Sequence, residues 1–350
     1  EFILPNINLV KKIENKTNLK GNFSFESSNL IRNYETNIFE KYNINDLIFN
    51  SSPKIYNNGF YNSYDFIIKN VNSDTQNSKK FKEGDNIYLS SMFQFNSSLP
   101  LMKENNKFQK ILTPKLTLKM SPNHTNDISN DEERIDVNNI YNLNRVSTSN
   151  TLEGGLSMAY GSDYILLNKQ NSREIFGFKL ANNLRIEENN KLPKNTQLGE
   201  KTSNIFSEIF YNPSEFFNLK YNVSLKNDVQ DISYENLIAE FSVNNFVTKF
   251  DYINENNTSS KNSYLLNSTE YSLNDSNTIK FSTRENKTSD LTEYYNLMYQ
   301  YKNDCLAASI EYNKNYYDDR DVKPEENIFL KLTIIPFGET SSPNLKDWWC

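Results

Sequence analysis

Residues 217–226 read Phe217-Asn218-Leu219-Lys220-Tyr221-Asn222-Val223-Ser224-Leu225-Lys226, so that apolar side chains occupy the odd positions and polar side chains the even positions. Alternation with a period of two predicts a β-strand with one apolar and one polar face. Helical periodicity is weak almost everywhere along the chain. The same alternation returns in six further segments: 108–120, 152–160, 246–253, 295–301, 306–312 and 328–334. The sequence therefore predicts an all-β fold of antiparallel strands.

The connections between the last seven predicted strands alternate in length. We expect tight turns at 244–245, 274–277 and 303–304, and longer loops at 255–262, 285–291 and 317–326. Strands of about 9 to 11 residues, with short periplasmic turns at one edge and long outer loops at the other, are typical of a transmembrane β-barrel. Tyrosines gather near the ends of these strands, as in an aromatic girdle: Tyr294, Tyr295, Tyr299, Tyr301, Tyr312, Tyr316 and Tyr317.

A soluble antiparallel β-sandwich with one wet face explains the alternation equally well. The ordered lengths of the connections and the tyrosines favour the barrel, whereas the low glycine count of 9 argues against it. Both folds stay open at this point, and no domain boundary or tandem repeat stands out.

The composition excludes several classes of protein. The longest apolar runs fall far short of the ~20 residues that a membrane helix needs. Aromatic residues make up 13% of the 350 residues, which is too many for a disordered chain. The net charge of −6, without a basic arm or tail, argues against a nucleic-acid partner. The chain begins at Glu1 with neither Met nor a signal peptide, and we expect it to be a fragment of a longer protein.

Catalytic and metal-binding motifs are missing. His124, the only histidine, lies in a turn-like segment, and two cysteines with one histidine give no zinc spacing. The acidic clusters 131–134 and 318–321 lack the ligand spacing of a calcium loop, so solvated loop charges explain them better. No nucleotide-binding fingerprint is present. We therefore expect no enzyme activity, no catalytic residue, no metal site and no cofactor.

Several segments carry a family resemblance. They are Leu4-Pro5-Asn6-Ile7, Leu19-Lys20-Gly21, 112–116, 120–123, Asn144-Arg145, Glu153-Gly154-Gly155, Tyr160-Gly161, 299–306, 310–312, 319–325 and 329–338. Together they resemble the C-terminal barrel region of the LptD family of lipopolysaccharide-assembly proteins from the outer membrane of Gram-negative bacteria. The likeness runs in order over nearly the whole chain, and the segment around Cys305 is its most specific part.

The resemblance implies a function and a set of partners. Residues 1–338 would form part of an outer-membrane barrel, and 339–350 a periplasmic tail, with the periplasmic domain and the first strands absent. The barrel would insert lipopolysaccharide into the outer leaflet, surrounded by outer-membrane lipid. An LptE-like lipoprotein would plug it, and an LptA-like periplasmic bridge would deliver substrate through the missing domain. A general porin or uptake barrel and a soluble or surface β-sandwich adhesin remain alternatives.

The resemblance also implies a lateral gate between the first and last barrel strands. Its C-terminal half would be the last strand: Ile328, Phe329, Leu330, Lys331, Leu332, Thr333 and Ile334. Alternation on the last two strands places these side chains on the lipid face: Leu306, Ala308, Ile310, Tyr312, Ile328, Leu330, Leu332 and Ile334. It places Ser309, Glu311, Lys331 and Thr333 in the lumen.

Both cysteines are expected on the periplasmic side. Cys305 follows the tight turn at 303–304, and the last strand must return to the same side before Cys350. Disulfides persist in the oxidising periplasm. In the resembling family, a cysteine at the position of Cys305 bonds to the periplasmic domain. Three outcomes stay open: a bridge between Cys305 and Cys350, separate bonds to the missing domain, or a free thiol.

Overall fold

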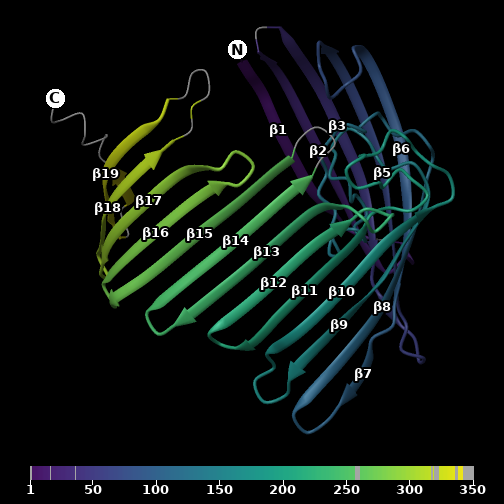
Figure 1. Cartoon of the computed structure of the whole chain (residues 1–350). Helices are drawn as coiled ribbons and strands as arrows, with labels where there is room; N and C mark the ends of the chain where they lie inside the picture. Colours follow the sequence, from purple (N-terminus) through teal and green to yellow (C-terminus); the bar gives the residue numbers. More distant parts are fainter. Residues whose placement is uncertain are drawn as a thin grey trace. The chain divides into compact units, whose positions relative to one another are not determined.

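In the computed structural model, twenty strands form one antiparallel meander sheet (Figure 1). The structure describes residues 2–15, 17–35, 37–256, 261–316, 318, 323–335 and 338–341. Within these ranges a single sheet confirms the all-β antiparallel prediction and leaves no second sheet for the sandwich alternative. In the part of the chain that the structure describes, no helix has the length and apolar content needed to cross a membrane.

The chain divides into two compact units, although no boundary was evident in the sequence. Unit 1 comprises Glu1–Gln170, Phe178–Ser207 and Ser224–Asp231. Unit 2 comprises Asn171–Gly177, Glu208–Val223 and Ile232–Cys350.

Unit 1 contains the first nine strands and most of the tenth. They are β1 Phe2–Ile13, β2 Gly21–Tyr34, β3 Ile38–Ser51, β4 Lys54–Ile55, β5 Tyr61–Gln76, β6 Gly84–Ser98, β7 Leu101–Glu104, β8 Phe108–Ser121, β9 Gly155–Asn168 and β10 Glu174–Arg185. The main strands pair antiparallel in chain order, with the short β4 and β7 added beside β5 and β8.

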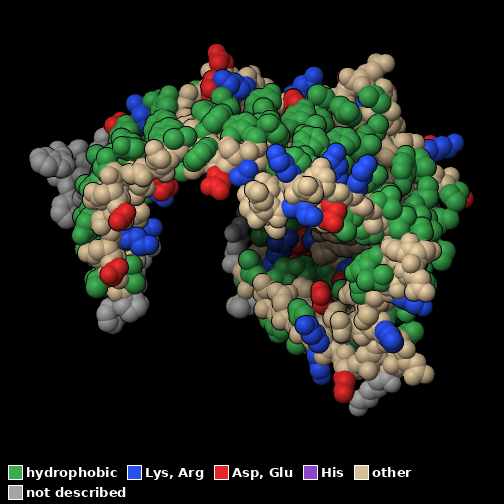
Figure 2. Space-filling view, turned by 90° about the horizontal axis from the view of Figure 1, so that it is seen from below, with side chains coloured by type: hydrophobic (Ala, Val, Ile, Leu, Met, Phe, Trp, Pro, Cys, Tyr) green, Lys and Arg blue, Asp and Glu red, His purple; other side chains and the backbone are tan. Residues whose placement is uncertain are grey.

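The two faces of the unit 1 sheet differ in chemistry. The inner face carries the long segments 122–154 and 186–204, which pack on it. On the opposite, outer face an aromatic row crosses four strands, with ring centroids 4.6 Å apart for Phe23 and Phe49 and 6.3 Å apart for Tyr64 and Phe93. Figure 2 shows hydrophobic side chains over much of the outer surface of the strands. An outer face with exposed aromatic and aliphatic side chains is typical of a membrane barrel.

Unit 2 contains most of β11 and β12 and all of the later strands. They are β11 Ile205–Ser214, β12 Phe217–Leu225, β13 Ile232–Val243, β14 Phe246–Asn256, β15 Lys261–Asn274, β16 Asn277–Asn286, β17 Leu291–Lys302, β18 Leu306–Asn315, β19 Glu325–Ile334 and β20 Gly338–Ser341. Ile310 lies opposite Leu330 in the ladder of β18 and β19, and both side chains are exposed. Glu311 and Lys331 point to the other face, which carries the hydrogen bonds between side chains. The predicted division of β18 and β19 into an apolar and a polar face therefore agrees with their register.

The predicted strands lie where strands form, with differences at their ends. The segment 152–160 does not start a strand until Gly155, because the three residues before it are held in loop contacts described below. The connections expected at 255–262 and 285–291 are shorter in the structure, because hydrogen-bonded pairing extends the strands on either side of them. Strand β14 ends at Asn256 and β15 begins at Lys261, whereas β16 ends at Asn286 and β17 begins at Leu291. The strands of the first hundred residues were not predicted, since their alternation is broken by polar residues on both faces.

Candidate functional site

The segments 122–154 and 186–204 fill the inner side of unit 1. Their apolar side chains form one cluster with residues of the adjacent strands: Ile128, Ile135, Val137, Ile140, Val146, Ala159, Ala181, Leu192, Leu198 and Phe206. Ile140, Val146 and Leu198 have no exposed surface at all. Burial on this scale stabilises the loops in one arrangement, because each large apolar side chain contributes about 1.5–3 kcal/mol. The inner side of this unit is therefore a packed core.

Hydrogen bonds join the segment 122–154 to the strand walls. Lys69 of β5 donates from Nζ to the carbonyl oxygen of Ser149 at 3.0 Å, and to Asp46 of β3 at 2.6 Å. Gln94 of β6 donates from Nε2 to the carbonyl oxygen of Tyr141 at 2.9 Å. Strand side chains thus satisfy buried loop carbonyls, as buried backbone groups require.

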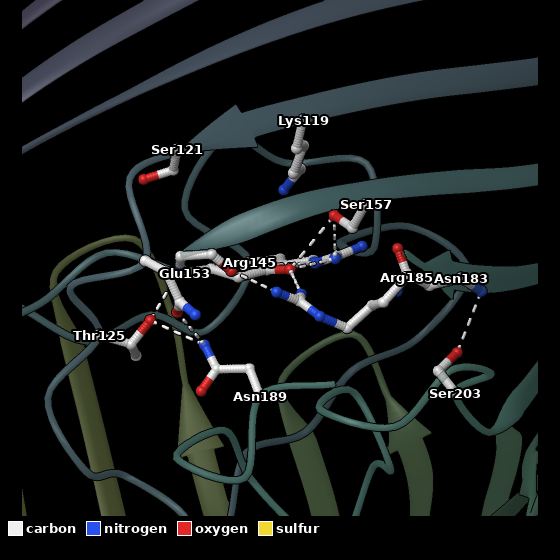
Figure 3. A network of polar contacts seen from close by, with 12 residues as sticks. Lys119, Ser121, Thr125, Arg145, Glu153, Ser157, Asn183, Arg185, Asn189 and Ser203 are labelled. Carbon is white, nitrogen blue, oxygen red and sulfur yellow. Dashed lines mark hydrogen bonds and ion pairs between the residues drawn. The ribbon is translucent and has the colours of Figure 1, made fainter. Parts of the chain in front are cut away.

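A buried ion cluster lies at the centre of this packing (Figure 3). Arg145 donates two hydrogen bonds to the Glu153 carboxylate, from Nε at 2.7 Å and from Nη2 at 2.6 Å. Arg185, at the end of β10, adds an ion pair to the same carboxylate and donates to the carbonyl oxygen of Gly154. Ser157 of β9 accepts from Arg145 at 3.1 Å. The side chains of the three charged residues are 3% exposed or less.

The cluster also fixes the two long segments to each other. Thr125 Oγ1 accepts from the backbone N–H of Gly154 at 2.7 Å and from Nδ2 of Asn189 at 3.1 Å. A Cβ on Gly154 would lie 2.8 Å from the carbonyl oxygen of Pro122, so only glycine fits this close approach. Contacts from both segments therefore converge beside Glu153.

The electrostatics of Glu153 are those of a structural anchor. Burial alone would raise the pKa of Glu153, but Arg145 and then Arg185 hold that pKa well below its usual range. A carboxylate bound in this way stays ionised and makes a poor general base. The arrangement instead locks the loops, since removing one partner of a buried ion pair costs about 3–5 kcal/mol.

The structure places Cys305 in the short connection between β17 and β18. Its thiol is exposed and free, its backbone N–H donates to Oδ1 of Asn303 at 3.0 Å, and its carbonyl oxygen accepts from Ile335 at 2.8 Å. Cys350 lies outside the described residues. The disulfide predictions therefore stay predictions, and the described part of the chain contains no disulfide.

The predicted gate residues all lie in β19. Ile328, Leu330 and Ile334 are exposed on its apolar face. One edge of β19 pairs with β18 along its whole length, and the other pairs with β20 from Lys331 to Ile334. Strand β20 thus follows the strand that the sequence suggested was last, and it includes the first residues of the predicted tail 339–350. The remainder of that tail, 342–350, lies outside the described residues.

No role for Arg145, Glu153 or Arg185 followed from the sequence. Asn144-Arg145 and Glu153-Gly154-Gly155 carry part of the family resemblance, but the resemblance implies no function for them. The two charged residues lie eight positions apart in a loop without periodicity, and no local pattern shows that they meet. The available signal was that both lie in a segment too long for an ordinary connection, with Glu153 directly before Gly154-Gly155.

Comparison with known proteins gives one family match. A family model described as LptD, LPS transport system D, matches residues 3–276. The match includes Arg145, Glu153 and Arg185 and ends before Cys305. No curated protein sequence matches the chain.

Similar solved structures are outer-membrane receptors and porins. A mutant of the ferric enterobactin receptor PfeA from Pseudomonas aeruginosa has a TM-score of 0.45 and 10% identity, covering 95% of this chain and 62% of the receptor. A porin mutant from Rh. blastica has a TM-score of 0.33 and 9% identity, over 88% of this chain and 95% of the porin. The siderophore receptor PirA from Acinetobacter baumannii has a TM-score of 0.43 and 8% identity, over 94% and 64%. The chain thus spans less than two thirds of the length of these receptors.

Proposed function

The chain belongs to the LptD family of lipopolysaccharide-transport proteins, and from this membership we propose that it is part of the outer-membrane barrel that inserts lipopolysaccharide into the outer leaflet. As a member of a family of transport barrels it is located in the outer membrane and is not an enzyme. The observation that carries the proposal is the family match, which extends over most of the chain.

The structure supports this proposal through the two faces of its strands. In unit 2, Phe241, Leu297 and Leu330 are exposed on the apolar face, which suits contact with lipid. The opposite face is polar: Asn236 donates to Asp251, and Asn296 to Glu311, both at 2.6 Å. Amide and carboxylate groups of this kind suit passage of a sugar-rich headgroup. A general porin has less support, because loops of the chain itself fill the inner side of unit 1.

Three partners belong to the proposal. Lipopolysaccharide is the transported molecule, an LptE-like lipoprotein is the plug, and an LptA-like periplasmic bridge is the donor through a periplasmic domain. A plug needs an inner surface that the chain leaves uncovered. The polar face of unit 2 meets this need, since no apolar side chain of unit 2 is buried in the described part of the chain.

Two residue-level roles also remain proposals. Strand β19, with Ile328, Leu330 and Ile334 on its lipid face, would be part of the lateral gate. Cys305 would form a disulfide with a periplasmic cysteine, because its exposed thiol lies at the edge of the short turns. Non-reducing gels of the full-length protein should show a mobility shift that Cys305→Ser abolishes. An unchanged shift in the variant would refute the role of Cys305.

Depletion in the native host tests the function itself. Loss of the protein should lower the amount of lipopolysaccharide exposed at the cell surface and cause lipopolysaccharide to accumulate at the inner membrane. Sugar uptake should not fall before the surface lipopolysaccharide does. Normal surface lipopolysaccharide together with lost solute uptake would show an uptake barrel instead.

A further inference from the structure

A basic cavity opens at one end of unit 1, and Thr125, which accepts from the backbone N–H of Gly154 next to the buried ion cluster, is part of its lining. Its volume is about 640 Å³, and it is lined by residues of three connections and one strand: 79–82, 87–89 of β6, 123–127 and Lys191. Strand β8 ends and β9 begins at this end of the unit, and β6, antiparallel to β8, starts there. The two longest connections of the unit, 122–154 and 186–204, therefore emerge from this end.

The charge around the cavity is strongly positive. Lys79, Lys80, Lys82 and Lys191 line it together with His124, and Asp127 is the one acidic residue of the lining. None of the four lysines forms a salt bridge within the described ranges, although Lys69 and Lys115 of the same unit do. Asp127 is already engaged, because its Oδ1 accepts from the backbone N–H of Ser129 at 3.0 Å. Such a concentration of unpaired cations is unexpected in a chain of net charge −6.

The lysine-bearing connection is held in one conformation. Ser78 Oγ accepts from the backbone N–H groups of Lys80 and Phe81, both at 3.1 Å, and donates to the buried Glu40 at 2.6 Å. The Phe81 ring is buried 5.0 Å from the ring of Tyr42. Lysines on a fixed backbone lose less entropy on binding than lysines on a free loop.

Two further features favour an anion in this cavity. Strand β6 pairs with β8 only from Phe93 to Ser98, so the edge of β6 nearer its start, which includes the cavity-lining residues 87–89, has a strand partner on one side only. Burial lowers the pKa of the Lys80 ammonium group, and a bound anion would offset that effect. Several cations that converge on one concave surface raise the local concentration of anions.

We propose that this cavity binds the phosphate groups of a phosphorylated glycan headgroup at the outer surface of the barrel. Lysine ammonium groups bind phosphate as point charges without demanding one geometry, which suits a headgroup that carries more than one phosphate. The cavity, about 640 Å³ in volume, is larger than a single inorganic phosphate and has room for a phosphorylated sugar. The nature of the headgroup rests on the proposed function, whereas the anion site does not.

Calorimetry on the full-length protein in detergent micelles tests the site, with inorganic pyrophosphate as the probe. The triple variant Lys79→Gln, Lys80→Gln and Lys82→Gln should bind pyrophosphate about tenfold more weakly or worse, since each exposed charge contributes up to about 1 kcal/mol. The matched control removes three exposed lysines at the opposite end of the same unit: Lys103→Gln, Lys107→Gln and Lys110→Gln. The control should change the affinity less than about twofold, because charges beyond a Debye length are screened. Equal losses in the two triples would overturn the site.

A competition experiment separates the headgroup from free phosphate. A glucosamine disaccharide with two phosphates should displace pyrophosphate at a lower concentration than inorganic phosphate does. The same disaccharide without phosphate should not displace pyrophosphate. Equal displacement by inorganic phosphate and the bisphosphorylated sugar would overturn the headgroup assignment. These binding measurements do not depend on transport. A protein that binds pyrophosphate normally but does not restore surface lipopolysaccharide would refute the proposed function and leave the anion site standing.

Discussion

Unit 1 and unit 2 are built from the same kind of strand but stabilised in different ways. Every buried apolar side chain of the described residues lies in unit 1, where the segments 122–154 and 186–204 cover the inner face. In unit 2 the buried side chains are polar: Glu208, Ser233, Asn236 and Ser309. The difference teaches that alternating strands define two faces, whereas the connections decide whether one of those faces acquires a core.

The largest expected effect tests the ion cluster that anchors the loops of unit 1. Glu153→Gln leaves Arg145 and Arg185 buried without their counter-charge, and the free energy of unfolding should fall by about 3–5 kcal/mol. Urea unfolding in micelles measures this loss, and limited proteolysis should show cleavage within 122–154. The matched variant Glu293→Gln in unit 2 removes the partner of Arg284, which is 37% exposed, and should cost about 1 kcal/mol or less. Equal losses would mean that the cluster is no anchor.

The second prediction compares apolar side chains in the two units. Leu198→Ala removes a fully buried side chain from the unit 1 core and should lower the free energy of unfolding by about 2–5 kcal/mol. Leu330→Ala truncates an exposed side chain on the apolar face of β19 and should cost about 0.5 kcal/mol. The same unfolding assay measures both variants. A larger loss for Leu330→Ala would show that the lipid-facing surface, rather than the core, dominates stability.

The smallest effect concerns acid. Because the pKa of Glu153 is lower in the folded protein than its ordinary value of 4.5, its stabilising contribution is complete above that pH. Below pH 4.5 unit 1 should lose about 1.4 kcal/mol per pH unit from this group, until the pH approaches the folded pKa. Protease sensitivity of 122–154, measured from about pH 6 down to about pH 3 with an acid-active protease, reports the loss. Glu153→Gln should flatten this slope, and an unchanged slope would assign it to other carboxylates.

Alternation allowed the strands of the second half to be predicted closely. The segment 217–226 forms β12 (Phe217–Leu225), and the turn at 244–245 separates β13 from β14. A strand with one apolar and one polar face records its orientation locally, in successive residues. In β2, β3 and β5 the outer face itself carries hydrogen-bonded asparagines such as Asn43, Asn45 and Asn70, so the alternation is masked.

The candidate site could not be predicted in this way. Glu153 meets Arg145 across 8 positions of chain and Arg185 across 32, and the lysines of 79–82 meet Lys191 across a cavity. Contacts between irregular segments leave no period in the sequence. Only the family resemblance marked two of these segments, and it gave them no role.

The sequence by itself determined the all-β class, the antiparallel order of the later strands, the apolar and polar faces of β18 and β19, and the family. These properties depend on neighbouring residues and on short connections, which the order of side chains specifies directly. The tertiary structure alone decided that two long connections fold inward, that a carboxylate held by two arginines fixes them, and that unpaired lysines surround one cavity. Those features arise from packing between segments distant in the chain, where burial and charge pairing depend on which groups the fold brings together.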